Sequence, residues 1–134
     1  MANMDVTAVP VTPFRQNCSI LRCTTTNRAA VVDPGGDPDT IAAALAQTGA
    51  EIERILITHG HLDHAGATRH LADRWQVPIE GPHRDDAFLI DRIPDQAERY
   101  GFSHADRFEP DRWLEAGDTV RVGEVTLEVF HCPG

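Results

Sequence analysis

Residues 54–66 read RILITHGHLDHAG, and this stretch decides the fold. The run Ile55-Leu56-Ile57 is short and continuously apolar, which is typical of a strand buried on both faces. The segment HGHLDH, directly after Thr58, holds four potential metal ligands in six residues. Imidazole and carboxylate groups both bind zinc and iron. The stretch therefore predicts a metal site at the carboxyl end of a buried strand.

The spacing of these ligands predicts room for two metal ions. His59 and His61 are two residues apart in an extended segment, so their side chains project to the same side and can bind one ion. Asp63 and His64 lie further round the turn, at the start of the next helix, and can bind a second ion. Gly60 permits a tight backbone between the two histidines. The alternative is a chance cluster of solvated or helix-capping side chains, and an apolar strand directly before the cluster disfavours it.

The segments around this motif predict alternating strands and helices. The predicted elements are strands at 17–23, 28–32, 54–58 and 77–80, helices at 38–48, 65–75 and near 85–92, and a hairpin of strands at 119–122 and 125–131. Asp37 is the expected N-cap of the first helix, and Gly49 is expected to end it. Strand and helix alternate, so we expect one α/β structural unit over residues 1–134.

Composition and charge exclude several classes of protein. The chain has 134 residues, a formal net charge of −9 and 41% hydrophobic residues, which are ordinary values for one globular domain. An acidic chain is a poor partner for nucleic acid or an anionic membrane surface. The sequence has neither an apolar run of transmembrane length nor a signal-peptide pattern at its start. Cys18, Cys23 and Cys132 form no CxxC pair, so we expect reduced thiols and a cytoplasmic protein.

The sequence resembles the metallo-β-lactamase-fold hydrolases, whose hallmark is His-X-His-X-Asp-His after a buried strand. Residues 59–64 match this pattern at every fixed position, and VVDPG at residues 31–35 matches the family's apolar strand ending in Asp-X-Gly. The segments TPFRQNC (12–18) and FHCPG (130–134) are similar to segments of the glyoxalase II-like, or hydroxyacylglutathione hydrolase-like, subgroup. The resemblance implies an αββα sandwich, of which this chain supplies about the first half to two-thirds.

The resemblance also implies a role for each matched residue. His59 and His61 bind a first divalent metal ion, and Asp63 and His64 bind a second; zinc is expected, with iron and manganese as alternatives. A hydroxide between the two ions is the nucleophile, and Asp63 orients it as the catalytic residue. Asp33 supports the site without binding metal. The implied activity is hydrolysis of a small thioester such as S-D-lactoylglutathione.

The family pattern contains further ligands that this chain lacks. The next one is a histidine directly after Cys-Pro-Gly, one position beyond Gly134. We therefore expect the chain to be the amino-terminal part of an enzyme, monomeric when complete and open to self-association as a fragment. Two alternatives stay open: a mononuclear non-haem iron dioxygenase of persulfides, which is similar over this span, and an inactive metal-binding fragment. Metal counting separates the dioxygenase from the hydrolase.

Overall fold

A five-stranded sheet is the centre of the computed structural model, which describes residues 4–11, 16–58, 60, 62–100 and 107–129. The strands lie in the order β1 (Met4–Val11), β2 (Gln16–Cys23), β3 (Arg28–Val32), β4 (Glu51–Leu56) and β5 (Ile79–Glu80). The β1–β2 and β2–β3 pairs are antiparallel, whereas the β3–β4 and β4–β5 pairs are parallel. The carboxyl ends of β3, β4 and β5 therefore lie at the same edge of the sheet.

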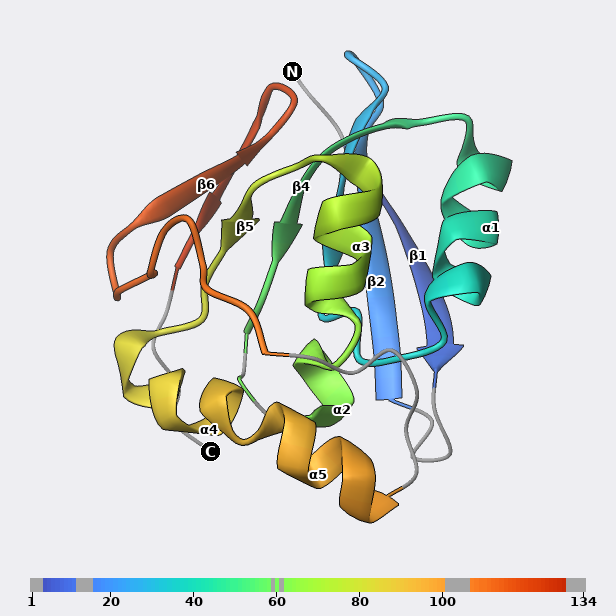
Figure 1. The fold of residues 1–134 in the computed structure, drawn as a ribbon. Coiled ribbons are helices and arrows are strands. Elements are labelled where there is room, and N and C mark those ends of the chain that lie inside the picture. Colours follow the sequence, from blue (N-terminus) through green and yellow to red (C-terminus); the bar gives the residue numbers. More distant parts are fainter. Residues whose placement is uncertain (1–3, 12–15, 59, 61, 101–106, 130–134) are drawn as a thin grey trace.

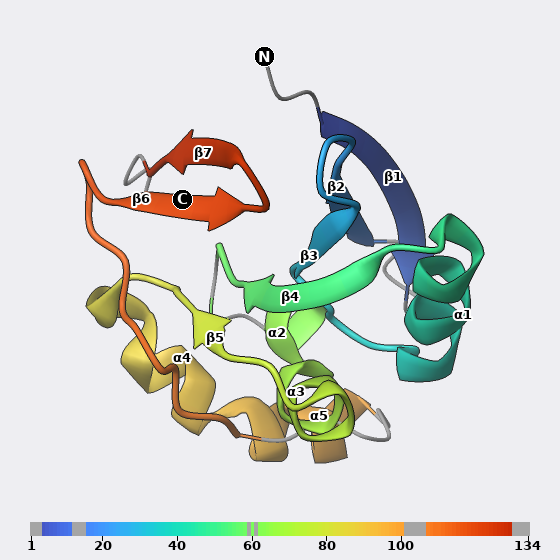
Figure 2. The same ribbon diagram turned by 90° about the horizontal axis from the view of Figure 1, so that it is seen from above.

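Helices cover one face of this sheet (Figure 1). They are α1 (Pro38–Thr48), α2 (Leu62–Ala65), α3 (Thr68–Trp75), α4 (Ala87–Asp91) and α5 (Ile93–Tyr100), with a short 3-10 turn, η1 (Arg84–Asp86), before α4. The strands β6 (Thr119–Val122) and β7 (Val125–Glu128) form a separate antiparallel hairpin. Figure 2 shows this hairpin on one side of β4 and α3 on the other. The layers are thus helices, main sheet and hairpin.

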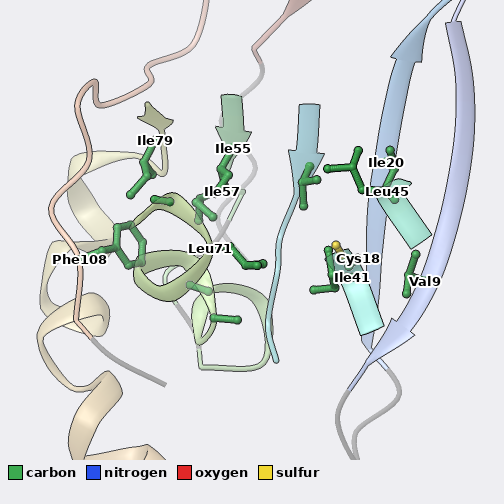
Figure 3. Close-up of a cluster of buried hydrophobic side chains, with 14 of the residues drawn as sticks. Val9, Cys18, Ile20, Ile41, Leu45, Ile55, Ile57, Leu71, Ile79 and Phe108 are labelled. Carbon is green, nitrogen blue, oxygen red and sulfur yellow. The ribbon is translucent and has the colours of Figure 1, made fainter. Parts of the chain in front are cut away.

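The larger core lies between the sheet and the helices. Ile55 and Ile57 pack with Leu71 of α3 on this face. On the same face, Ile41 and Leu45 of α1 lie near the side chains contributed by β1 and β2 (Figure 3). Alternation along the strands sends the other side chains to the opposite face, as expected for a sheet covered on both sides.

The second face carries a smaller core under the β6–β7 hairpin. Leu56 of β4 and Ala30 of β3 pack there with Val120 and Val122 of the hairpin. The Glu53 carboxylate accepts a hydrogen bond from the Gly123 N–H at 3.1 Å, which ties the hairpin turn to the sheet. This arrangement confirms the predicted α/β class, with a helix layer followed by two β layers.

A β-bulge divides β4 into two parts. Ala29 of β3 is the partner of Ile52, and Ala30 is the partner of Arg54, so Glu53 is an extra residue in β4. Because of this extra residue, both Ile52 and Ile55 face the helix layer although they are three positions apart.

Several predicted elements are confirmed, two of them with shifted bounds. The helix over 38–48 is α1, and Gly49 ends it with a left-handed φ of +69°. Asp37 precedes α1 as predicted, but its side chain makes no capping hydrogen bond. The strands predicted at 17–23 and 28–32 are β2, which starts one residue earlier, and β3. The predicted hairpin is β6–β7, whose second strand ends at Glu128, and the predicted residues 130 and 131 lie outside the described part.

Other predictions need correction. The single helix predicted over 65–75 is two helices, because the chain turns after Ala65 and the Ala67 N–H donates a hydrogen bond to the Pro34 carbonyl oxygen at 2.9 Å. The edge strand β1 and the helix α5 were not predicted. The β1 sequence contains Pro10, which lacks the N–H that a central strand needs but is tolerated at an edge. Within the described residues, no helix combines the length and the apolar character that crossing a membrane requires.

Candidate metal centre

Two adjacent parallel strands bring Asp33 and Thr58 together. Asp33 directly follows β3, and its N–H donates a hydrogen bond to the Leu56 carbonyl oxygen at 2.9 Å, so strand pairing continues one residue beyond β3. Thr58 lies two residues beyond Leu56. Asp33 has a φ of +55°, a left-handed conformation that Asp and Asn tolerate better than most residues. The end of the parallel pair thus sets the position of the Asp33 carboxylate.

The Asp33 carboxylate is the centre of a buried hydrogen-bond network. Its Oδ1 accepts the Thr58 backbone N–H at 2.7 Å, and its Oδ2 accepts the Thr58 hydroxyl. The Nδ1 atom of His64 lies 3.1 Å from the same Oδ2. Asp33 is only 7% exposed, so these contacts are shielded from water. A carboxylate that holds Thr58 on one side can orient the His64 ring on the other.

This contact decides which nitrogen of His64 can bind a metal. A carboxylate oxygen accepts hydrogen bonds, so the proton of the neutral ring belongs on Nδ1, where it points at Asp33. The lone pair is then on Nε2. A carboxylate–histidine pair of this kind is the usual outer support of a metal-binding imidazole. The chemistry of the His64–Asp33 pair therefore fits a metal ion bound through Nε2.

The Gly60 position is closed to any larger residue. A Cβ at Gly60 would lie 2.9 Å from the Asp86 carbonyl oxygen and 3.2 Å from the Leu89 Cβ. Gly60 has no positive φ, so glycine is needed here for space and not for a special backbone conformation. The helices α4 and α5 pack against α2, which carries the second half of the motif. The segment 84–91 thus packs beside Gly60 and α2.

The structure brings together part of the predicted site. His64 in α2 is half-buried and contacts Asp33. His59, His61 and the side chain of Asp63 lie outside the described residues, so their assignment as ligands stays a prediction. The histidine at 131 and the segment 130–134 also lie outside the described part.

Sequence reasoning missed two residues of this region. Thr58 was assigned only to the strand before the motif, although a hydroxyl at the end of a strand is a usable signal. Asp86 was not assigned to the site, yet it is half-buried and accepts a hydrogen bond from the Gly60 N–H. Because that contact joins residues 26 positions apart, no local pattern in the sequence indicates it.

Cys18 lies on β2 in the helix-side core, and its thiol is neither exposed nor activated. Burial, together with the smaller effect of the Asp33 charge, raises the pKa of Cys18 to about 12. A thiol with this pKa stays protonated near neutral pH and is a poor nucleophile and metal ligand. Among the described residues, Cys18 and Cys23 are both free and buried.

Comparisons with known proteins agree with this geometry. The family model described as "Metallo-beta-lactamase superfamily" matches residues 11–134. Hydroxyacylglutathione hydrolase GloC of Haemophilus influenzae is 37% identical over 132 residues, which are 98% of this chain and 62% of that protein. The crystal structure of the B3 metallo-β-lactamase BLEG-1 matches with a TM-score of 0.81 and 26% identity, over 97% of this chain and 62% of that one.

A second similar structure was solved with iron bound. The crystal structure of TTHA1623 in a di-iron-bound form matches with a TM-score of 0.75 and 27% identity, over 85% of this chain and 56% of that one. This chain therefore spans about three-fifths of the length of the relatives it matches.

Proposed function

Because the chain belongs to the metallo-β-lactamase superfamily, we propose that it carries half of a dinuclear metal site in a glyoxalase II-like thioester hydrolase. The observation that carries the metal site is the contact between Asp33 Oδ2 and His64 Nδ1 at 3.1 Å. His59 and His61 would hold the first ion, and Asp63 and His64 would hold the second. Zinc is the expected metal, and iron and manganese are the alternatives.

The residues of this chain have separate tasks in the proposed reaction. Asp33 orients His64 and keeps its proton on Nδ1, and Asp63 accepts a hydrogen bond from the attacking water. Metal ions bound here supply a water of lowered pKa at neutral pH and polarise the substrate carbonyl. A thioester suits such a site because its thiolate leaves readily, with little help from a general acid. The substrate class is supported by the similarity to the Haemophilus hydroxyacylglutathione hydrolase.

We also propose that the reaction takes place in the cytoplasm and that the substrate is a small molecule. The free thiols of Cys18 and Cys23 suit a reducing compartment. The net charge of −9 is unsuited to nucleic acid and to anionic membrane surfaces. S-D-lactoylglutathione is the first substrate to test.

The test is metal analysis and turnover with the full-length protein. We expect two ions per chain and release of free thiol from S-D-lactoylglutathione. His59→Ala should lose metal and turnover together, whereas His70→Ala, the same change at a histidine of α3 away from the motif, should retain both. Unchanged metal content in His59→Ala would overturn the proposed site. A single iron per chain with oxygen consumption would overturn the hydrolase in favour of an iron dioxygenase.

A further inference from the structure

We propose that Asp86 is a positioning residue for the first metal site, because it holds the Gly60 amide between the ligands His59 and His61. This inference rests on the metal site of the proposed function. It concerns a residue that lies outside the HGHLDH motif and follows it by more than twenty positions.

The contact itself is a hydrogen bond from a backbone amide to a side-chain oxygen. The Gly60 N–H donates to the Asp86 Oδ2 at 3.0 Å. This N–H belongs to the peptide bond that joins His59 to Gly60, so the carboxylate fixes the plane of that peptide. The contact is shielded from water because Gly60 is buried and Asp86 is half-buried.

Packing removes the remaining freedom of the Gly60 backbone. The position of a Cβ at Gly60 is 2.9 Å from the Asp86 carbonyl oxygen and 3.3 Å from the Asp86 Cβ. The same position is 3.2 Å from the Leu89 Cβ. Gly60 is therefore held by a hydrogen bond in one direction and by close contact in another.

Asp86 can hold Gly60 only because its own backbone is anchored. The Asp86 N–H donates to the His83 carbonyl oxygen at 3.0 Å, which closes the η1 turn. The His83 ring accepts the Asp85 N–H at 3.1 Å, and the Arg84 guanidinium lies 5.6 Å above the Trp113 ring. The turn is thus fixed before and beside Asp86, which makes its carboxylate a stable point of attachment.

The chemistry predicts which substitutions matter. The role needs an acceptor oxygen at Oδ2 and not a charge as such, so Asp86→Asn should retain it and Asp86→Ala should lose it. Asp85→Ala is the matched control, because it removes the same charge one residue earlier, from a side chain that is 72% exposed. Loss of an outer partner of metal ligands weakens metal affinity by about 10–100-fold.

The experiment measures zinc affinity with a competing chelator in the full-length protein, together with the NMR signal of the Gly60 amide in the metal-free protein. We expect Asp86→Ala to weaken binding of one zinc ion by about 10-fold or more and to shift the Gly60 amide signal. Asp86→Asn and Asp85→Ala should stay close to wild type in both. Urea unfolding of the metal-free variants reports any general loss of stability separately.

Each result decides a different point. Any one of three results would overturn this inference. Asp86→Ala and Asp85→Ala could bind zinc equally well, or the Gly60 amide signal could be unchanged in Asp86→Ala. The third is that Asp86→Asn binds zinc as weakly as Asp86→Ala. If the zinc affinities are as expected but wild type does not hydrolyse the thioester, the proposed activity is overturned and the inference is supported. Wild-type protein that binds no zinc, iron or manganese would overturn both.

Discussion

Replacement of Asp33 by Asn is the sharpest test of the candidate metal centre. The change keeps the size of the side chain and suits the left-handed φ of +55° at this position, since Asn tolerates that conformation as Asp does. It therefore removes hydrogen bonds without adding backbone strain. The Asn oxygen can still accept the Thr58 N–H, but an NH2 group then faces the Thr58 hydroxyl and the His64 ring.

The expected loss of metal affinity follows from the hydrogen bonds that Asp33→Asn removes. A hydrogen bond to a charged acceptor contributes about 1.5–3 kcal/mol. The Thr58 hydroxyl can rotate and accept from the new NH2 group, but the His64 Nδ1–H cannot. His64 would have to move its proton to Nε2, the nitrogen that the metal needs. The loss of the His64 bond alone then corresponds to about 10–150-fold weaker binding of the ion held through His64.

The assay is metal competition against a chromophoric chelator, with the tautomer of His64 read from nitrogen NMR of the metal-free protein. Asp39→Asn is the control, because it makes the same chemical change at a side chain that is 92% exposed and paired only with Arg74 in the described contacts. If Asp33→Asn binds metal as tightly as wild type and the His64 proton is still on Nδ1, the proposed role of Asp33 is refuted.

Three further changes test other parts of the structure. Gly123→Ala would place a Cβ 2.1 Å from the Thr26 hydroxyl oxygen at a φ of +57°, so we expect the free energy of unfolding to fall by about 2–5 kcal/mol. Gly117→Ala is the control, because Gly117 has a φ of +91° but open space at its Cβ position, so this variant should lose only the stability that backbone strain costs. Equal losses of unfolding free energy for Gly123→Ala and Gly117→Ala in urea titrations would contradict the packing argument. Burial raises the pKa of Cys18 from 9.0 to about 12, so this thiol ionises in the unfolded chain at a lower pH than in the folded protein. Between pH 9 and pH 12, wild type should therefore lose about 1.4 kcal/mol of stability per pH unit relative to Cys18→Ala. Parallel pH profiles of the two proteins would argue for a normal thiol. Thr58→Val should weaken metal binding about 10-fold while Thr58→Ser retains it, and equal affinities would remove the hydroxyl from the network.

The sequence allowed the strands and helices around the motif to be predicted because their signals are local. The α1 bounds follow from Pro38 at the start and Gly49 at the end, and both are properties of single positions. The buried strand before the motif was visible as an apolar run. The bulge in β4 was not, since a bulge depends on how the strand pairs with β3 and not on the strand itself.

The site was predictable as a set of residue types and less so as a set of contacts. Asp33 was identified through its resemblance to a family motif, and its contact with His64 needs the parallel pairing of β3 and β4 to bring the two loops together. Asp86 was not assigned to the site, because two adjacent acidic residues in a polar stretch are usually solvated. Its hydrogen bond to Gly60 exists only because η1 folds back onto the motif.

The extra residue in β4 also makes this strand tolerant of one change in length. Beyond the bulge, Arg54 already pairs with Ala30, so deletion of Glu53 would restore regular pairing with β3 and leave every later residue on its present face. Ile55 would stay on the helix side and Leu56 on the hairpin side, and the Thr58 position beside Asp33 would be kept. The deletion would instead remove the carboxylate that holds the hairpin turn through the Gly123 N–H, so its effect would fall on the hairpin and not on the metal motif.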